Sequence, residues 1–384
     1  MGLQLDDKDG FTRRKFLQVS AGTAAAMMVT ALPNFSWAQA LKVEKVGLEQ
    51  CLSLTPLQMA KKSNLVQASY DYITGICGEI TNQVLRDRVL QVIHNPAPTF
   101  MQRYTTSDAQ KILWQKLVAA KYLSETIGVD DFLPPSENIQ KASQPFYAAP
   151  GSGYMSHHAY PGGLATHTAF NIRSSLNVSQ GYFETFDYKL DRDLIIAAQA
   201  LHDLHKPWVF QWQEDGSCLK EITLAGQGAH HVLGIAESIY RGFPPDVVVA
   251  QACAHNHPGS EKDEVEVIEW IKAACIIADK DPIGEGLLSA DGSTLPIPRR
   301  QENFVTHLGD HDWVLSGPAV KWTLPALKKI AQQEYKMNDQ ELNGKKFNAL
   351  RNYVFSQFSA MRSYQVLATQ GEAGLRAKVR EMIG

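Results

Sequence analysis

Histidine is concentrated in the middle of this chain, and its spacing is the strongest constraint on the fold. Nine of the twelve histidines fall between His157 and His257. With two acidic residues they form an ordered series: His167, His202 with Asp203, His230, His255 or His257, and Asp279. Successive members are separated by 35, 27, 25 and 24 residues, each roughly one helix plus a turn. Imidazole and carboxylate groups are usual ligands for iron, manganese, nickel, cobalt and zinc, so the series predicts helices that converge on metal.

The adjacent pair His202 and Asp203 ends a segment, 193–203, whose apolar residues recur at helical spacing. Neighbouring side chains on a helix point about 100° apart, so one such pair can serve two ions. Asp203 is the natural bridge, because each of its two oxygens can bind a different ion in a two-metal hydrolytic site.

Five segments of the chain resemble the HD-domain metal-dependent phosphohydrolases, which carry the pattern His…His-Asp…Asp on a bundle of helices. They lie in the family's order between Tyr147 and Gly284: HHAYPGGLATHT at 157–168, ALHDLHKP at 200–207, AHHVLGIAE at 229–237, AHNHPGS at 254–260 and ACIIADKDP at 274–282. The paired histidines and the GGL of the first segment are most similar to the branch that contains HD-type 3′-5′ exoribonucleases.

The resemblance implies two divalent ions, of manganese, iron, nickel, cobalt or zinc. It implies that the first ion is held by four residues: His167, His202, Asp203 and Asp279. The second would be held by His230 and by His255 or His257. We prefer His230 to His231, which we interpret as structural, because the family's histidine is followed four residues on by a glycine, here Gly234. The apolar pair before His255 favours it over His257, but the sequence leaves both open. This ligand set requires Asp279 to face His202.

The same resemblance implies a reaction in which Asp203 bridges the ions and an activated water attacks a phosphoryl group. Lys206 would be a point charge for the phosphate. His205, His157 and His158 are candidates to protonate the leaving group or to bind phosphate, because imidazole titrates in the right range. His205 occupies a position where relatives have glycine, and it would place a bulky ring where substrate approaches. The histidines of the 157–158 pair could instead cap their loop.

Two further histidines, His307 and His311, have the i, i+4 spacing of a helical metal site. Because Gly309 and Asp310 between them predict a turn, we interpret the pair as part of a solvated loop.

The rest of the sequence predicts an all-α fold. Apolar residues at helical spacing predict helices in 55–93, 106–128, 317–337 and 348–370, and proline and glycine mark residues 134–163 as the entry to the metal-binding domain. The segment 208–224 reads as a small β-hairpin, whose Trp208, Phe210 and Trp212 we assign to the core or a lid rather than to base stacking. The predicted divisions are a signal peptide at 1–40, an N-terminal helical region at 41–146, the metal-binding domain at 147–284 and a C-terminal helical region at 285–384.

The N-terminus is similar to a twin-arginine export signal. Arg13 and Arg14 precede a weakly apolar stretch that ends at Leu32, and a small-x-small cleavage site follows at 38–40. The alternative is an uncleaved anchor, but the 16–32 stretch is short and contains polar residues. We expect the export machinery as a partner and a periplasmic protein without a membrane anchor.

Composition bounds the function. The formal charge of −3 gives no overall basic footprint for wrapping long nucleic acid. Five cysteines without a CxxC motif indicate neither a thiolate zinc cage nor a redox pair, and Cys253 and Cys275 read as buried thiols. We therefore predict a metal-dependent phosphohydrolase acting on a phosphomonoester or phosphodiester, such as a nucleotide or short nucleic acid. An HD-domain di-iron oxygenase and a non-catalytic metal-clamped binding module are the alternatives.

Overall fold

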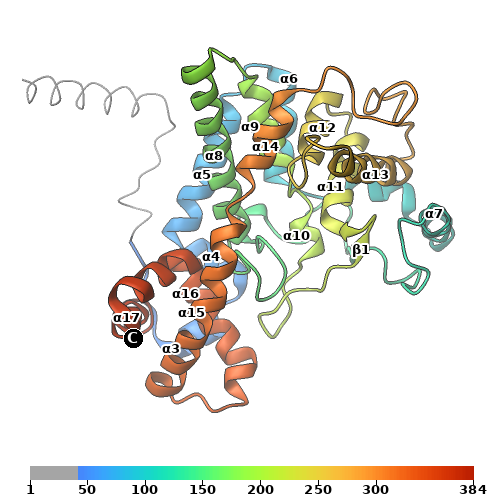
Figure 1. Cartoon of the computed structure of the whole chain (residues 1–384). Helices are drawn as coiled ribbons and strands as arrows, with labels where there is room; N and C mark the ends of the chain where they lie inside the picture. The colour runs from blue at the N-terminus through green and yellow to red at the C-terminus, as the bar shows by residue number, and fades with distance from the viewer. Residues whose placement is uncertain (1–41) are drawn as a thin grey trace, which may run out of the picture.

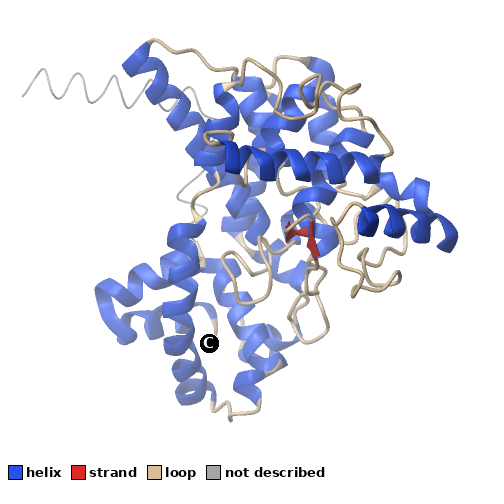
Figure 2. Cartoon of the chain, turned by 45° about the vertical axis from the view of Figure 1, so that its right-hand side comes forward, coloured by secondary structure: helices blue, strands red, loops and turns tan. Residues whose placement is uncertain are grey.

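The computed structural model describes residues 42–384, and the predicted export signal therefore lies outside the described residues. Within this range the regular elements are almost all helices, joined by several long loops, and the strands are confined to a two-stranded ribbon with two isolated bridges (Figure 2). The all-α prediction is confirmed. Among these helices none is both long and apolar enough to cross a membrane.

The first half of the fold runs from α3 to the ribbon. Its elements are α3 (Leu48–Ser53), α4 (Pro56–Lys62), α5 (Asn64–Gly78), α6 (Gln83–His94), η1 (Thr99–Tyr104), α7 (Ser107–Ala119), η2 (Phe146–Ala148), α8 (Gly163–Phe186), α9 (Arg192–Leu201), α10 (Lys206–Val209), β1 (Thr223–Leu224) and β2 (Gln227–Gly228).

The second half carries α11 (Ala229–Tyr240), α12 (Pro245–Ala252), α13 (Glu261–Ala278), α14 (Gln301–Gly309), α15 (Trp313–Tyr335), η3 (Glu341–Asn343), α16 (Lys345–Phe358) and α17 (Ala360–Met382).

The helix predictions hold in position but not always in length. The predicted helix at 106–128 ends at Ala119, because the chain turns at Lys121 with a positive φ of 64°. The predicted helix at 348–370 is divided into α16 and α17 by Ser359, whose φ of 54° is outside the helical region. The spacing of apolar residues does not reveal where a single residue adopts the left-handed conformation and ends a helix.

The segment 208–224 forms a hairpin-like loop rather than a regular hairpin. Trp212 and Cys218 form an isolated antiparallel bridge around the expected turn, and the paired strands β1 and β2 follow it. Trp208 and Phe210 are buried in the main core, in agreement with a packing role.

Two hydrophobic clusters hold the fold together. The larger is built from residues between Ala60 and Leu295 and includes the apolar faces of α5, α8, α9 and α11–α13. The smaller joins the two ends of the described chain, with α3 and α4 packed against α16. Val46 pairs in parallel with Ile383, so both ends lie in the same lower lobe (Figure 1).

Helix α9 explains how the site is positioned. Asp191 caps its N-terminus by accepting a hydrogen bond from Leu194, and every residue from Leu194 to Leu201 is buried. Three of these are alanines, and small side chains allow α8 and α12 to pack closely on α9. The helix therefore ends in the interior, where it delivers His202 and Asp203.

Candidate metal centre

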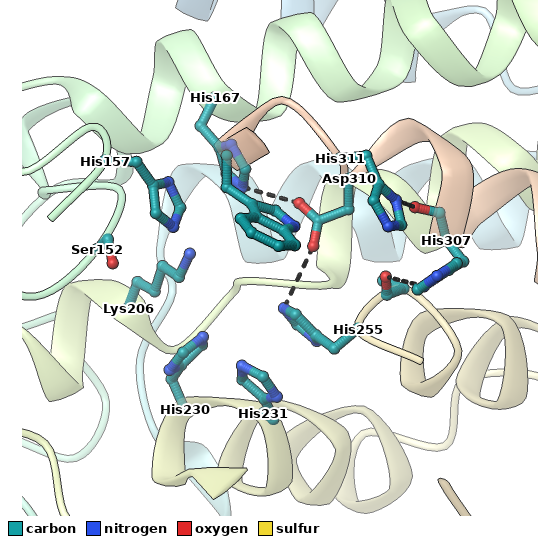
Figure 3. A pocket seen from close by; sticks show the side chains of 12 residues that line it. Ser152, His157, His167, Lys206, His230, His231, His255, His307, Asp310 and His311 are labelled. Atoms are coloured by element: carbon teal, nitrogen blue, oxygen red, sulfur yellow. Dashed lines mark hydrogen bonds and ion pairs between the residues drawn. The ribbon is translucent and has the colours of Figure 1, made fainter. Parts of the chain in front are cut away.

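Five elements bring the site residues together. His167 lies in the second turn of α8, His202 and Asp203 follow α9, and His230 opens α11. His255 follows α12, and Asp310 follows α14. His167, His230, His255 and Asp310 line one cavity (Figure 3), and His202 and Asp203 are each only 1% exposed.

One group of ligand atoms, which we call group A, is tightly clustered. Nε2 of His202 lies 3.4 Å from Nε2 of His167 and 3.0 Å from Oδ2 of Asp203. Nε2 of His167 lies 3.2 Å from Oδ2 of Asp203 and 3.0 Å from Oδ1 of Asp310. Ligand atoms about 2.1 Å from a common ion are about 3.0 Å apart at right angles and about 3.4 Å apart at tetrahedral angles. The observed separations match this range.

A second group, group B, lies on the other side of the two carboxylates. Oδ1 of Asp203 is 3.4 Å from Nε2 of His230 and 3.5 Å from Nε2 of His255. Oδ2 of Asp310 is 3.7 Å from the same nitrogen of His255. Each carboxylate therefore turns one oxygen toward group A and the other toward group B.

Hydrogen bonds orient three of the imidazoles. Nδ1 of His202 donates to the carbonyl oxygen of Gln199 at 2.7 Å. Nδ1 of His167 lies 3.1 Å from a carboxylate oxygen of Asp312, and Nδ1 of His230 hydrogen-bonds to Glu221. Because each Nδ1 has an acceptor, Nε2 is the nitrogen that each ring directs into the site, as in metal-ligating histidines.

The amide of Asn171, one turn after His167 on α8, donates to Oδ1 of Asp310 at 2.7 Å. This hydrogen bond fixes the orientation of the carboxylate between the two groups. No motif in the sequence marks Asn171 as part of the site.

The charges of the site are mutually dependent. Burial disfavours the charged form of His202, but Asp203 and Asp310 outweigh it and raise the pKa of His202 to about 9. Burial also opposes the charged form of His167, but the neighbouring carboxylates, above all that of Asp312, raise the pKa of His167 well above its ordinary value. Burial alone would raise the pKa of Asp310, yet the facing histidines hold it well below the usual range. In the metal-free protein, the imidazoles of His167 and His202 are therefore positively charged at the place where a cation would fit.

Unsatisfied atoms support this fit. Oδ1 of Asp203 and Nε2 of His230 are buried and make no hydrogen bond, whereas Oδ2 of Asp203 has the ammonium nitrogen of Lys206 at 2.5 Å. Buried polar groups normally have partners, and a bound metal ion would be a partner for these two atoms. Within residues 42–384, several groups of histidine and aspartate side chains are close enough to hold a metal ion.

Asp279 is not part of this site, and its predicted role as a ligand is wrong. It caps the C-terminus of α13 in the left-handed conformation. Its side chain is 50% exposed, and it forms ion pairs with Arg103 and, at 3.8 Å, with Lys116. Asp310, from beyond the predicted domain boundary at 284, occupies the position assigned to Asp279.

The structure separates His255 from His257, whereas His231 lies close enough to His230 and His255 to share a metal ion with them. His255 faces both carboxylates, whereas His257 is 34% exposed and lies 4.0 Å from Asp263. His231 lines the cavity and stacks on His255 with ring centroids 3.5 Å apart. Burial, followed by the charges of His255 and His230, holds the pKa of His231 well below its ordinary value.

His205 does not face substrate, contrary to expectation. Its ring is fully buried against Phe100 and Trp208, and its Nε2 lies 3.7 Å from Glu237. His205 precedes α10, and its side chain points into the core because it packs against these two aromatic rings. The predicted catalytic role of His205 is therefore contradicted.

The loop histidines have different positions. His158 is buried and both ring nitrogens are engaged, with Asp312 at 2.5 Å and with the Tyr160 hydroxyl at 3.2 Å. It braces Asp312 and is not among the residues that line the cavity, so its predicted substrate contact is wrong. Gly163 makes this loop possible, because a Cβ there would collide with the carbonyl of His158.

His157 and Lys206 do line the cavity. Burial, followed by the positive charge of Lys206, lowers the pKa of His157 to about 2, so its ring is neutral at pH 7. The Lys206 ammonium also donates to the carbonyl of Gly151 at 2.6 Å.

The cavity has a volume of about 360 Å³. It is lined by Ser152, His157, His167, Lys206, His230, His231, Ala254, His255, His307, Asp310, His311 and Trp313. The interpretation of His307 and His311 as a solvated loop is therefore wrong. A turn does lie between α14 and α15, but Gly309 lets it pack inward, since a Cβ there would collide with Ser175 and Gln199.

Four residues at or beside the site, His307, Asp310, His311 and Asp312, share one signal in the sequence. The run at 307–312 contains two histidines and two aspartates in six positions, a density that marks the segment even though it lies outside the resemblance. Asp310 and Asp312 are both buried.

The five cysteines are free and buried, as expected for Cys253 and Cys275.

Part of the chain is similar in sequence to a known phosphodiesterase. The chain is 32% identical, over 111 residues, to the dihydroneopterin 2′,3′-cyclic phosphate phosphodiesterase of Methanocaldococcus jannaschii. The match covers 29% of this chain and 44% of that protein, so less than half of the relative's length is represented. No protein-family model and no solved structure matches the chain. The chain is thus similar, over part of its length, to a phosphodiesterase.

Proposed function

We propose that the protein is a metal-dependent phosphodiesterase that holds two divalent ions. The observation that carries the proposal is the division of the Asp203 carboxylate. One of its oxygens faces the imidazoles of His167 and His202, and the other faces those of His230 and His255. Two ions bound in this way would lower the pKa of a bridging water and neutralise charge on a phosphoryl group.

The residues around the ions suit an anionic ester. Lys206 is the one ammonium among the cavity-lining residues of the described chain, and it lies beside the bridging carboxylate. A phosphate oxygen is an alternative partner for this charge. The neutral ring of His157 can give a hydrogen bond to the same group.

The substrate class follows from size and charge. A cavity of about 360 Å³ suits a small diester of nucleotide size, and the chain's formal charge of −3 gives no attraction for long nucleic acid. The phosphodiesterase relative, whose name specifies a cyclic phosphate, supports a small cyclic diester. Membership of the HD-domain phosphohydrolases, and of the exoribonuclease branch in particular, remains a hypothesis.

The test combines metal content with turnover on one sample. We expect about two ions per chain and hydrolysis of 2′,3′-cyclic nucleotides with manganese, cobalt or nickel under anaerobic conditions. Iron with oxygen-dependent turnover and no phosphate-ester hydrolysis would instead indicate the di-iron oxygenase. A His202→Ala protein with full activity would indicate that metal serves only as a structural clamp.

Export is a separate proposal. We expect the N-terminus of periplasmic material to be Leu41, determined by mass spectrometry. Substitution of both Arg13 and Arg14 by lysine should retain the precursor in the cytoplasm.

A further inference from the structure

Beyond the ligand atoms, one wall of the cavity is made of rings. We call His307, His311 and Trp313 the ring wall. The centroids of His307 and His311 are 4.3 Å apart at 83°, and those of His311 and Trp313 are 6.1 Å apart at 35°. All three residues line the cavity, and none belongs to a metal-capable group of the described chain.

The two imidazoles of the ring wall are held in place by backbone. Nδ1 of His307 donates to the carbonyl of Ala254 at 3.1 Å, and Nδ1 of His311 donates to the carbonyl of His307 at 2.8 Å. Each ring therefore has a fixed plane and a free Nε2. Pre-oriented rings lose little entropy when a ligand packs against them.

Trp313 is the least expected member of the wall. Its side chain is 50% exposed although it lies beside the cavity. An indole left half in water forgoes the burial that normally stabilises it, and exposed apolar side chains next to a cavity often mark a binding site. The next residues along α15, Val314 and Leu315, are also exposed.

The cavity is chemically divided. Lys206, Ser152 and His157 lie on one side, and His307 and His311 lie on the other, with Asp310 between the ligand groups and the ring wall (Figure 3). The side with Lys206 suits an anion. The ring wall presents flat π surfaces and no carboxylate other than that of Asp310.

We propose that the ring wall is a subsite for a planar heteroaromatic group, and that the protein prefers phosphodiesters carrying such a group over simple alkyl diesters. This inference rests on the proposed function, because the phosphate is placed at the ions and Lys206. Trp313 supplies the stacking face, and the free Nε2 atoms of His307 and His311 supply hydrogen-bonding edges. Stacking of a base on an aromatic side chain is sequence-tolerant, so the subsite would accept several heterocycles.

Equilibrium binding tests the subsite without turnover. Dissociation constants for guanosine 3′-monophosphate and for inorganic phosphate would be measured by calorimetry on the manganese-loaded protein. Trp313→Ala should weaken nucleotide binding about tenfold and leave phosphate binding unchanged, because only the ring contact is lost. Trp313→Phe should retain most of the nucleotide affinity.

Trp322 offers a matched control. It lies on the same helix and is 51% exposed, but it does not line the cavity. Trp322→Ala should leave both dissociation constants unchanged. Thermal unfolding and metal content of each variant would show that the fold and the ions are retained.

The outcomes separate this inference from the proposed function. Three results would each overturn the subsite. Trp313→Ala could lose phosphate and nucleotide affinity equally, it could lose neither, or the wild-type protein could bind the nucleotide no better than phosphate. Trp313-dependent nucleotide binding by a protein that hydrolyses no phosphodiester would overturn the proposed function and leave the subsite standing.

Discussion

Substitution of Asp310 by asparagine tests the composition of the site, and Asp279→Asn is its matched control. Both changes remove one negative charge and preserve side-chain size. Asp310 is buried with its oxygens 3.0–3.7 Å from the imidazoles of His167, His202 and His255. Asp279 is half exposed and faces Arg103.

The expected effect on metal binding is large for Asp310 alone. Removing a group that merely orients a metal ligand typically weakens metal binding about 10–100-fold. Because Asp310 is placed as a ligand itself, Asp310→Asn should weaken binding of at least one ion by about 100-fold or more. Asp279→Asn should retain the full metal content and activity.

The metal-free protein should respond in a pH-dependent way. The carboxylates hold the pKa of His202 at about 9, against an ordinary value of 6.5. This difference corresponds to about 3 kcal/mol of stability, fully present below pH 6.5 and lost as the pH rises through 9. Asp310 supplies part of it, so Asp310→Asn should lower the free energy of unfolding by about 1–3 kcal/mol at pH 6 and by less at pH 9.5. Asp279→Asn removes an exposed ion pair, which contributes at most about 1 kcal/mol.

Three assays would measure these effects. Elemental analysis after loading with manganese gives the metal content, hydrolysis of a 2′,3′-cyclic nucleotide gives the activity, and urea unfolding of chelator-treated protein gives the free energy of unfolding. An Asp310→Asn protein that retains two ions and full turnover would refute the assignment. Loss of metal from Asp279→Asn would restore the ligand set predicted from sequence.

Three further predictions address the neighbouring residues. Glu221→Gln and Asp312→Asn should each weaken metal binding about 10–100-fold, because each loses the charge that orients one ligand imidazole; two-site metal titrations in which neither constant changes would contradict this. His255→Ala should lower the metal content while His257→Ala leaves it unchanged, and the reverse pattern by elemental analysis would show that the wrong histidine is assigned. Lys206→Met should raise the KM for a cyclic nucleotide at least tenfold with metal content retained, whereas an unchanged KM would remove lysine from phosphate binding.

The sequence predicted much of the site because those residues carry local signals. His202 and Asp203 end a segment with a clear helical pattern, so their position at a buried helix end could be inferred without a fold. The spacing of His167, His230 and His255 likewise depends on helices of ordinary length. His255 was preferred to His257 from the apolar residues before it, and only His255 lies near the carboxylates.

The choice between Asp279 and Asp310 could not be made from sequence. Both follow the last turn of a helix, so a position at a helix end does not distinguish them. His205 and His158 were ambiguous for the same reason, because a histidine beside a turn can point into the core or into a cavity.

The amino-acid order by itself determined an all-helical chain whose histidines and one aspartate recur at helix ends. Tertiary packing decided which second aspartate joins them. Helix α14 lies against α8 and α9, where Gly309 permits close contact, and it therefore delivers Asp310 to His167 and His202. Helix α13 packs on α11 and ends near α7, so Asp279 meets Arg103 instead. A carboxylate becomes a candidate ligand only where its helix end is directed inward, and that direction is set by contacts between segments far apart in the chain.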